Sequence, residues 1–348
     1  MRVPGNIPSR GGPAGSPRKK RIGVIGSLVW DVIHGRGARS VPVEEWGGIT
    51  YSLSALDAAL PGDWEIVPTM MVGEDLAVRA REFLGTLRRM APDASLMAVP
   101  YPAQRVELRY HSEERRTERL TGGLPAWSWL ALKPLLDASR LDALLINFLS
   151  GWELDLETAK LIRQNFQGPI HCDLHMMAWA VQPDGLRTLR PIPDVAEWCR
   201  CFDFLQMNED ELAMVAPDPM SLAATAISAG VSCLFVTLGK RGAIYVAAPG
   251  FDGITDLPPR TGLSTAPRGG TGGIGAVRTA RVLAEPVDES LDPTGCGDVW
   301  GATYFSRMLA GDKLADAMKA AGRAAARNVG HRGVTGLASH LRGELSLT

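Results

Sequence analysis

The sequence predicts an α/β fold in which a mostly parallel central sheet is flanked by helices, with a small β-sheet lid beside it. Short buried apolar runs that end at a turn alternate with helical segments along most of the chain. Repeated strand–helix units favour parallel strands with both faces covered. In residues 104–120, apolar Val106 and Leu108 alternate with charged residues, which is typical of a strand with one solvated face. This ribbon predicts the lid, although an edge hairpin of the main sheet would give the same pattern.

The elements follow in order from these patterns. Apolar runs predict strands of the central sheet over residues 22–25, 65–72, 143–148, 169–174, 202–207 and 233–238. Helical spacing predicts helices over residues 74–90, 155–165, 208–215, 221–229 and 297–328, the last one broken near Gly311. Lys240, Arg241 and Gly242, followed by an apolar run, predict a tight hairpin.

Length and composition exclude several classes of protein. The 348 residues carry 37 basic and 38 acidic side chains, so a formal charge of -1 gives no general attraction to nucleic acid or to anionic lipid. The 45% apolar content excludes disorder for the bulk of the chain. No apolar run approaches the roughly 18 residues that cross a bilayer, so we expect no membrane partner.

The domain organisation is predicted to be simple. Residues 1–20 lack an apolar centre and are expected to form a disordered tail rather than a secretory signal. A single domain is expected over residues 21–340, with the lid inserted at about 30–50 and 104–121. Five scattered cysteines do not form a disulfide framework and favour a reducing, cytoplasmic compartment.

The most informative segment is residues 292–302. Gly295 and Gly297 flank the small Cys296, so the backbone can turn until successive N–H groups converge, and the helix that follows adds the positive end of its dipole. This combination predicts an anion site suited to a phosphoryl group. Asp298 would repel a bound phosphate, but it fits the role of a base that accepts a proton from an attacking hydroxyl. An ordinary helix start with a capping Asp is the simpler alternative.

Residues 292–298 resemble the C-terminal signature of the PfkB/ribokinase family of carbohydrate kinases. Five further segments resemble other landmarks of that family in the same order: residues 22–31, 46–48, 72–75, 208–211 and 237–242. One such motif would be modest evidence, whereas the ordered set is specific.

The resemblance implies an ATP- and Mg²⁺-dependent kinase that transfers the γ-phosphoryl group to a hydroxyl of a sugar or related small polyol. Asp298 is then the base, and the amides of Gly295, Cys296 and Gly297 form the anion hole. Asn208 and Glu211 organise Mg²⁺ and phosphate, with Glu211 acting through water. The resemblance assigns the nucleotide site to Thr237, Gly239, Gly242 and Asn328, and the acceptor site to Asp31, Gly47, Gly48, Ser52 and Arg109. The lid would close over substrate and could pair two subunits as a homodimer.

Several positions depart from the family pattern. Pro293 stands where Thr or Ser is usual, and Cys296 replaces Ala. Ile49 and Ser52 occupy the places of a Lys and an Asn after the Gly-Gly pair, and His175 replaces the Asn of an Asp-x-Asn motif. The phosphoryl-transfer residues are therefore complete, while the acceptor pocket is unusual and ribokinase itself is a poor match.

Other interpretations remain open. Arg105 and Arg109 could bind a phosphate already on the substrate, or they could form a solvated charged face. Trp127 and Trp129 could stack on a nucleobase, or pack under the lid. A metal cluster at His171, Cys172, Asp173 and His175 is less favoured than pocket or packing roles, because no second ligand group is evident. A nucleoside kinase of the same fold and a non-catalytic ligand sensor are the alternative functions.

Overall fold

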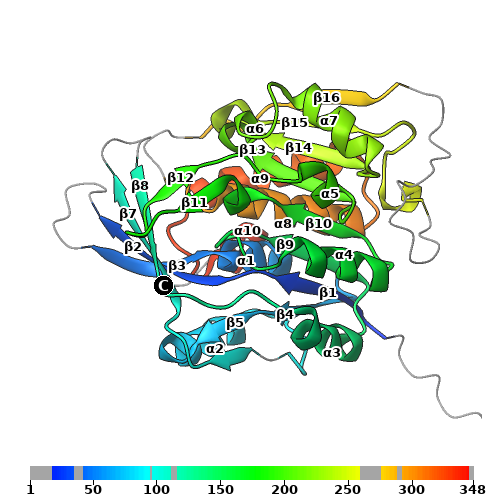
Figure 1. The fold of residues 1–348 in the computed structure, drawn as a ribbon. Helices are drawn as coiled ribbons and strands as arrows, with labels where there is room; N and C mark the ends of the chain where they lie inside the picture. Colours follow the sequence, from blue (N-terminus) through cyan, green and yellow to red (C-terminus); the bar gives the residue numbers. More distant parts are fainter. Residues whose placement is uncertain are drawn as a thin grey trace, which may run out of the picture.

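A computed structural model describes residues 18–34, 42–94, 96–110, 116–258, 276–287 and 292–344. Its main feature is an eight-stranded sheet in the order β16-β15-β14-β13-β10-β9-β1-β4 (Figure 1). The strands are β1 (Lys20–Ile25), β4 (Trp64–Thr69), β9 (Ala143–Asn147), β10 (Ile170–Asp173), β13 (Phe204–Asn208), β14 (Cys233–Thr237), β15 (Ala243–Ala247) and β16 (Arg278–Val282). All neighbours are parallel up to β14, and β15 and β16 continue antiparallel. The predicted mostly parallel sheet and the hairpin after β14 are confirmed.

Helices cover both faces of this sheet because its strands are apolar on both sides. Alternate residues of β9 enter different cores: Leu145 packs on one side, and Leu144 and Ile146 on the other. One layer contains α1 (Ile49–Ala59), α8 (Cys296–Leu309), α9 (Leu314–Val329) and α10 (Leu337–Arg342). The opposite layer contains α3 (Trp129–Ser139), α4 (Leu156–Asn165), α5 (Val195–Cys199) and α7 (Pro219–Ser228). The described helices include none with the length and apolarity that a bilayer crossing requires.

Two predicted elements differ in their bounds. The run over residues 65–72 is divided at Met70, so that β4 stays in the main sheet while β5 (Met71–Gly73) pairs with β6 (Met97–Val99). The helix expected over residues 74–90 is a 3-10 turn (Glu74–Leu76) followed by the shorter α2 (Ala77–Gly85). The break after residues 297–309 occurs where predicted, since Gly311 adopts a φ of 94° between α8 and α9.

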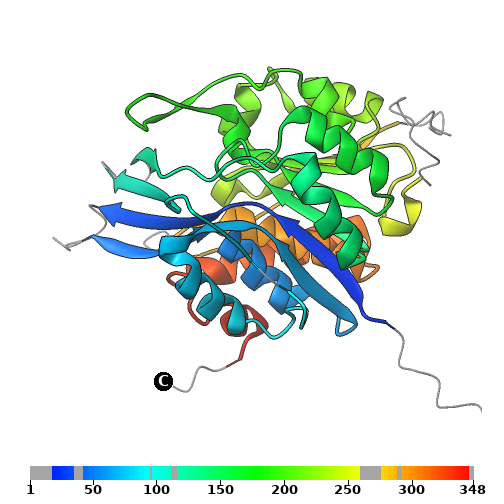
Figure 2. The same ribbon diagram turned by 60° about the horizontal axis from the view of Figure 1, so that its bottom comes forward.

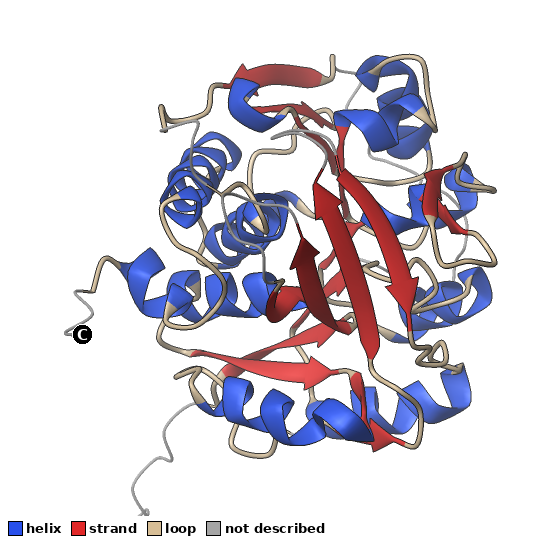
Figure 3. Ribbon diagram, turned by 90° about the vertical axis from the view of Figure 1, so that its left-hand side faces the viewer, coloured by secondary structure: helices blue, strands red, loops and turns tan. Residues whose placement is uncertain are grey.

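A separate four-stranded sheet stands beside the main one, as predicted for the lid (Figures 2 and 3). Its order is β3-β2-β7-β8, with β2 (Leu28–His34), β3 (Val43–Gly48), β7 (Gln104–Tyr110) and β8 (Arg116–Thr121). We call the face that carries Asp31 the inner face. Register places Glu45 and Val106 beside Asp31 on this face.

A hairpin that the sequence did not predict fastens this small sheet to the body. It consists of β11 (Trp179–Val181) and β12 (Arg187–Leu189), and it lies next to β8 (Figure 1). The Leu120 amide donates to the Gly185 carbonyl at 2.9 Å, and buried Arg187 forms an ion pair with Glu118 at 3.2 Å. The β8 edge of the small sheet is therefore covered by the chain's own turn.

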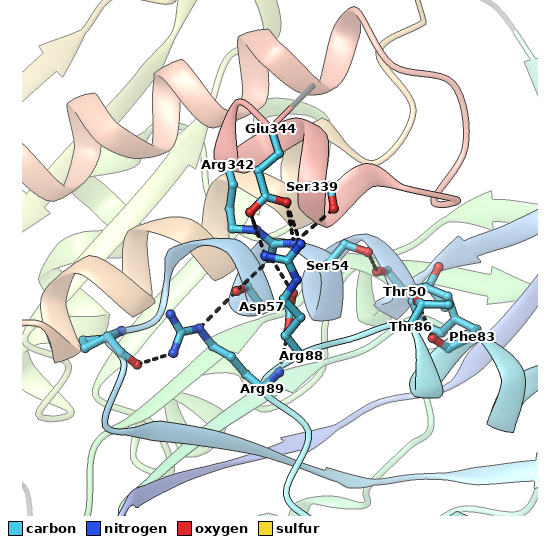
Figure 4. Close-up of polar contacts among 11 residues, drawn as sticks. Thr50, Ser54, Asp57, Phe83, Thr86, Arg88, Arg89, Ser339, Arg342 and Glu344 are labelled. Carbon is cyan, nitrogen blue, oxygen red and sulfur yellow. Dashed lines mark hydrogen bonds and ion pairs between the residues drawn. The ribbon is translucent and has the colours of Figure 1, made fainter. Parts of the chain in front are cut away.

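Polar contacts from the C-terminal segment of the chain hold α1, the helix that follows Gly47 and Gly48. The carboxylate of Asp57, at the end of α1, accepts from Arg342 of α10 at 2.6 Å and from the Arg89 amide at 2.7 Å (Figure 4). Glu344 bonds both Arg88 and Arg342. Because α1 also packs on α8, this cluster supports two helices that begin at the candidate site.

Candidate active site

The candidate active site lies where the parallel strands of the main sheet end. Asn147 ends β9, Asp173 ends β10, Asn208 ends β13 and Thr237 ends β14. Ligands of open α/β sheets bind beyond this carboxyl edge. The first turn of α8 reaches the same place, because the Asn147 amide donates to Asp298 Oδ1 at 2.6 Å.

Asp298 accepts hydrogen bonds from two side chains. Its carboxylate is partly exposed and also lies 3.5 Å from the Ser52 hydroxyl, which donates to it. Burial raises the pKa of Asp298 to about 6, although nearby His175 and the bond from Asn147 act in the opposite direction. The carboxylate is thus ionised at neutral pH, yet it holds a proton more readily than an exposed Asp does.

The glycine loop before α8 has a shape that only glycine allows at residue 295. Gly295 has a φ of 72°, and a Cβ built there would lie 2.2 Å from the Tyr51 ring. Among the described residues, the N–H groups of Gly295 and Gly297 have no hydrogen-bond partner. The Cys296 N–H donates to the Pro293 carbonyl at 3.1 Å. Two of the three predicted amides are therefore open to an anion, and the Cys296 amide instead closes the turn.

The side chains of Asn208 and Glu211 hydrogen-bond to each other. They form a capping box, in which the Glu211 amide donates to Asn208 Oδ1 and the Asn208 amide to Glu211 Oε2, each at 2.9 Å. Glu211 Oε1 also accepts from Asn208 Nδ2 and from His175 Nδ1, both at 2.7 Å. Glu211 is 1% exposed. The carboxylate assigned to Mg²⁺ thus has little capacity left for direct ligation, and no group of three metal-ligating side chains exists within the described segments.

His175 contacts Glu211 of the site, and it stands at the position where the family pattern has Asn. It is one of three non-glycine residues among those described that have positive φ, at 22°. Burial lowers the pKa of His175, but the carboxylates of Glu211, Asp173 and Asp298 together outweigh this effect and raise it to about 9. Burial raises the pKa of Asp173 well above its usual range, while His175 counteracts that shift. Buried His171 stacks on Phe305, which is a packing role.

Gln206 and Asn147 are site residues that the sequence analysis missed. Gln206 Nε2 donates to Asp173 at 2.9 Å and to the Gly297 carbonyl at 3.0 Å, so it links the glycine loop to the end of β10. A Cβ on Gly301 would lie 2.1 Å from Gln206 Oε1, so a larger residue there would displace the Gln206 carboxamide. The sequence signal that could have identified them is a polar residue within an apolar strand, as for Gln206, or at its end, as for Asn147.

Most of the residues assigned to the nucleotide lie near the ends of β13 and β14. Thr237 pairs with Asn208 across β13 and β14. Gly239 has a φ of 56°, and a Cβ there would meet no described atom within 4 Å, whereas a Cβ on Gly242 would strike the Val282 carbonyl at 2.0 Å. Asn328 differs from expectation: it is fully buried and donates to the Thr294 carbonyl at 2.8 Å. It supports the glycine loop rather than facing a ligand.

Four of the five residues that the resemblance assigns to the acceptor lie around the start of α1. The Asp31 carboxylate lies against Gly47, where a Cβ would be 2.0 Å from Oδ2, and Leu149 packs against Gly48. Ser52 contacts Asp298 as described. Arg109 is not brought to the other four: its strand partner is His34, which puts it on the face opposite Asp31, where it pairs with Glu107 at 2.5 Å.

Arg105 shares that outer face and binds Asp75 at 2.8 Å. The two arginines therefore form a paired surface, the second of the two interpretations. Trp127 is 3% exposed in the core, which favours packing, and Trp129 is partly exposed at the start of α3.

Residues 181–340 match the model of the pfkB family of carbohydrate kinases, which confirms the resemblance in that part of the chain. The motifs before residue 181 lie outside the match. A comparison with curated proteins finds no match.

Solved structures similar to this chain include several kinases of one fold. The ribokinase of Thermotoga maritima has a TM-score of 0.63 at 15% identity, over 93% of this chain and 98% of its own. A nucleoside kinase of Burkholderia thailandensis in complex with inosine has a TM-score of 0.61 at 14% identity, over 91% and 93%. A putative ribokinase II of E. coli in complex with ATP and Mg²⁺ has a TM-score of 0.61 at 15% identity, over 94% and 100%. These matches confirm the ribokinase-like fold.

Proposed function

We propose that this chain is an ATP-dependent kinase, because residues 181–340 match the pfkB family of carbohydrate kinases and the similarity to a ribokinase structure covers 93% of the chain. It transfers the γ-phosphoryl group to a hydroxyl of a sugar, a nucleoside or a related small polyol. One observation carries the proposal: Asp298 lies beside two open backbone amides at the start of α8. A carboxylate next to an anion site serves a reaction that moves both a proton and a phosphoryl group.

Each residue has a separate role in the proposed reaction. Asp298 accepts the proton of the attacking hydroxyl, and Asn147 holds the carboxylate in place. The Gly295 and Gly297 amides, with the positive end of the α8 dipole, stabilise the charge on the oxygens of the transferred group. Removal of one such donor from an anion hole typically costs about 10²-fold or more in rate. No covalent enzyme intermediate is required.

Mg²⁺ would supply charge neutralisation at the phosphates of the donor. Because Glu211 is occupied by Asn208 and His175, we propose that the cation arrives with ATP and that Glu211 reaches it only through water. The E. coli relative bound to ATP and Mg²⁺ supports this choice of cofactors.

The homodimer implied by the resemblance is proposed to use the β3 edge of the small sheet. The opposite edge, β8, is already covered by the turn before β12, since Leu120 bonds Gly185. Light scattering of the purified protein measures the oligomeric state.

The acceptor screen is the direct test. The protein is incubated with Mg·ATP and, separately, D-ribose, inosine and D-ribose 5-phosphate, and ADP release is measured. Acceptor-dependent ADP release supports the kinase, and the responding compound identifies the acceptor class. If ATP binds but no acceptor of a wider sugar and nucleoside panel increases ADP release, the sensor alternative is favoured and the proposal fails.

A further inference from the structure

Gln104 occupies a position on the small sheet that the catalytic scheme does not use. It begins β7, and register places it beside Val29, which itself lies beside Gly47. Side chains of paired residues point to the same side of a sheet, so Gln104 shares the inner face with Asp31. It is 1% exposed, which is rare for glutamine.

The carboxamide of Gln104 has no hydrogen-bond partner at either end among the described residues. Both Nε2 and Oε1 are fully buried, and neither bonds any described group. The polar residues on the other face of β7 are paired, since Arg105 binds Asp75 and Arg109 binds Glu107. A buried amide without a protein partner destabilises the folded state, so a ligand group that bonds it would account for the glutamine at this position.

The surroundings indicate what that group is. Asp31 lies one residue pair further along the same face, against the Gly-Gly pair that the site already includes. The buried Arg187 on the neighbouring hairpin is committed to Glu118 and to the Leu149 carbonyl. A carboxamide offers both donors and acceptors, as two neighbouring hydroxyls of a neutral molecule require.

We propose that Gln104 is a specificity-determining residue for the acceptor: its Oε1 accepts from one hydroxyl of an uncharged polyol, and its Nε2 donates to a neighbouring oxygen, while Asp31 binds further hydroxyls. This inference rests on the proposed kinase function and deepens it, because it assigns the acceptor to uncharged polyols. A site that hydrogen-bonds its substrate discriminates strongly, since its own buried polar groups are left unpaired by the wrong molecule.

The first experiment separates binding from structure without any substrate. In Gln104→Met, an apolar side chain of similar size replaces an unpaired amide, so the ligand-free melting temperature should be unchanged or higher. Gln206→Met is the matched control, because that buried glutamine bonds Asp173 and Gly297, and its melting temperature should fall. A fall for Gln104→Met equal to that of the control assigns Gln104 a structural role and overturns the proposal.

The second experiment measures the acceptor directly. D-Ribose, inosine and D-ribose 5-phosphate are titrated by calorimetry and tested for ADP release. We expect an uncharged acceptor, a loss of about tenfold or more in its kcat/KM with Gln104→Met, and an unchanged KM for ATP. An unchanged kcat/KM, or a response to the phosphosugar alone, contradicts the proposal.

The failure of the kinase function has a different signature. If wild-type protein binds D-ribose or inosine but no acceptor of the wider panel increases ADP release, the kinase function fails, and the Gln104 proposal is decided by whether Gln104→Met weakens that binding. If neither compound binds the wild type, the assignment of Gln104 to an uncharged acceptor of these two classes is rejected.

Discussion

The two ends of the site differ in how their polar groups are satisfied. At the end proposed for phosphoryl transfer, Asn208 and Glu211 are three residues apart and hydrogen-bond to each other, and Gln206 donates to the Gly297 carbonyl of the glycine loop. At the acceptor end, the Gln104 amide has no partner in the described part of the chain. Oxygens of Gln206, Asn147 and Asn328 are also buried without a partner in the described residues, but each of these side chains donates a hydrogen bond through its nitrogen. The side chains around the glycine loop are therefore held by protein contacts before any ligand binds, whereas both ends of the Gln104 amide await a partner.

The largest expected effect is at the centre of the phosphoryl end. Asp298→Asn removes the proton acceptor while it keeps the size of the side chain, so kcat should fall by about 10² or more. ATP affinity, measured by calorimetry, should change little. Because burial disfavours the ionised carboxylate, neutral Asn should not lower the melting temperature at pH 8. Unchanged turnover would remove Asp298 from the catalytic role.

The glycine loop provides its own matched pair of variants. Gly295→Ala introduces a Cβ at a φ of 72° and 2.2 Å from the Tyr51 ring, so the loop must move, at a cost of about 1–3 kcal/mol in strain. The Cβ of Gly297→Ala meets no described atom within 4 Å. We expect a clear loss of kcat for Gly295→Ala and a much smaller one for Gly297→Ala. Equal effects in steady-state assays would show that the shape of the loop is not what matters.

The pH dependence of turnover reports on the same carboxylate. Since the pKa of Asp298 is raised to about 6, the base becomes protonated as the pH falls through that value, and kcat should decline there. Asn147→Leu removes a donor that stabilises the ionised form, so the acidic limb should move to higher pH.

Ser52→Ala is the control for this shift, because its hydroxyl is 3.5 Å from Asp298 and contributes a weaker bond. Its acidic limb should move less than that of Asn147→Leu. A limb that stays in place in both variants would mean that another group controls the decline.

The smallest effect is expected at the outer face of the small sheet. Arg109→Ala breaks a pair with Glu107 in which the arginine side chain is 53% exposed, and such surface pairs contribute about 0–1 kcal/mol. The kcat/KM for the acceptor should therefore stay near the wild-type value. A large loss in the same acceptor assay would show that β7 presents its other face to the substrate.

Much of the fold and part of the site followed from local sequence patterns. Apolar runs predicted the strands of the main sheet, because a strand buried on both faces must be apolar along its length. The spacing of Gly295, Gly297 and Asp298 predicted a turn and the start of a helix, since the torsion angles of neighbouring residues decide both. The capping box of Asn208 and Glu211 is local for the same reason.

The tertiary structure alone decided which distant residues meet. Asn147 contacts Asp298 across 151 residues of sequence, and no local pattern encodes that approach. Alternation along β7 separates Gln104 from Arg109, but only the pairing of β7 with β2 put Asp31 on the face of Gln104. The sequence therefore determined which chemical groups the protein has and the turns that present them, and packing decided which of those groups share one pocket.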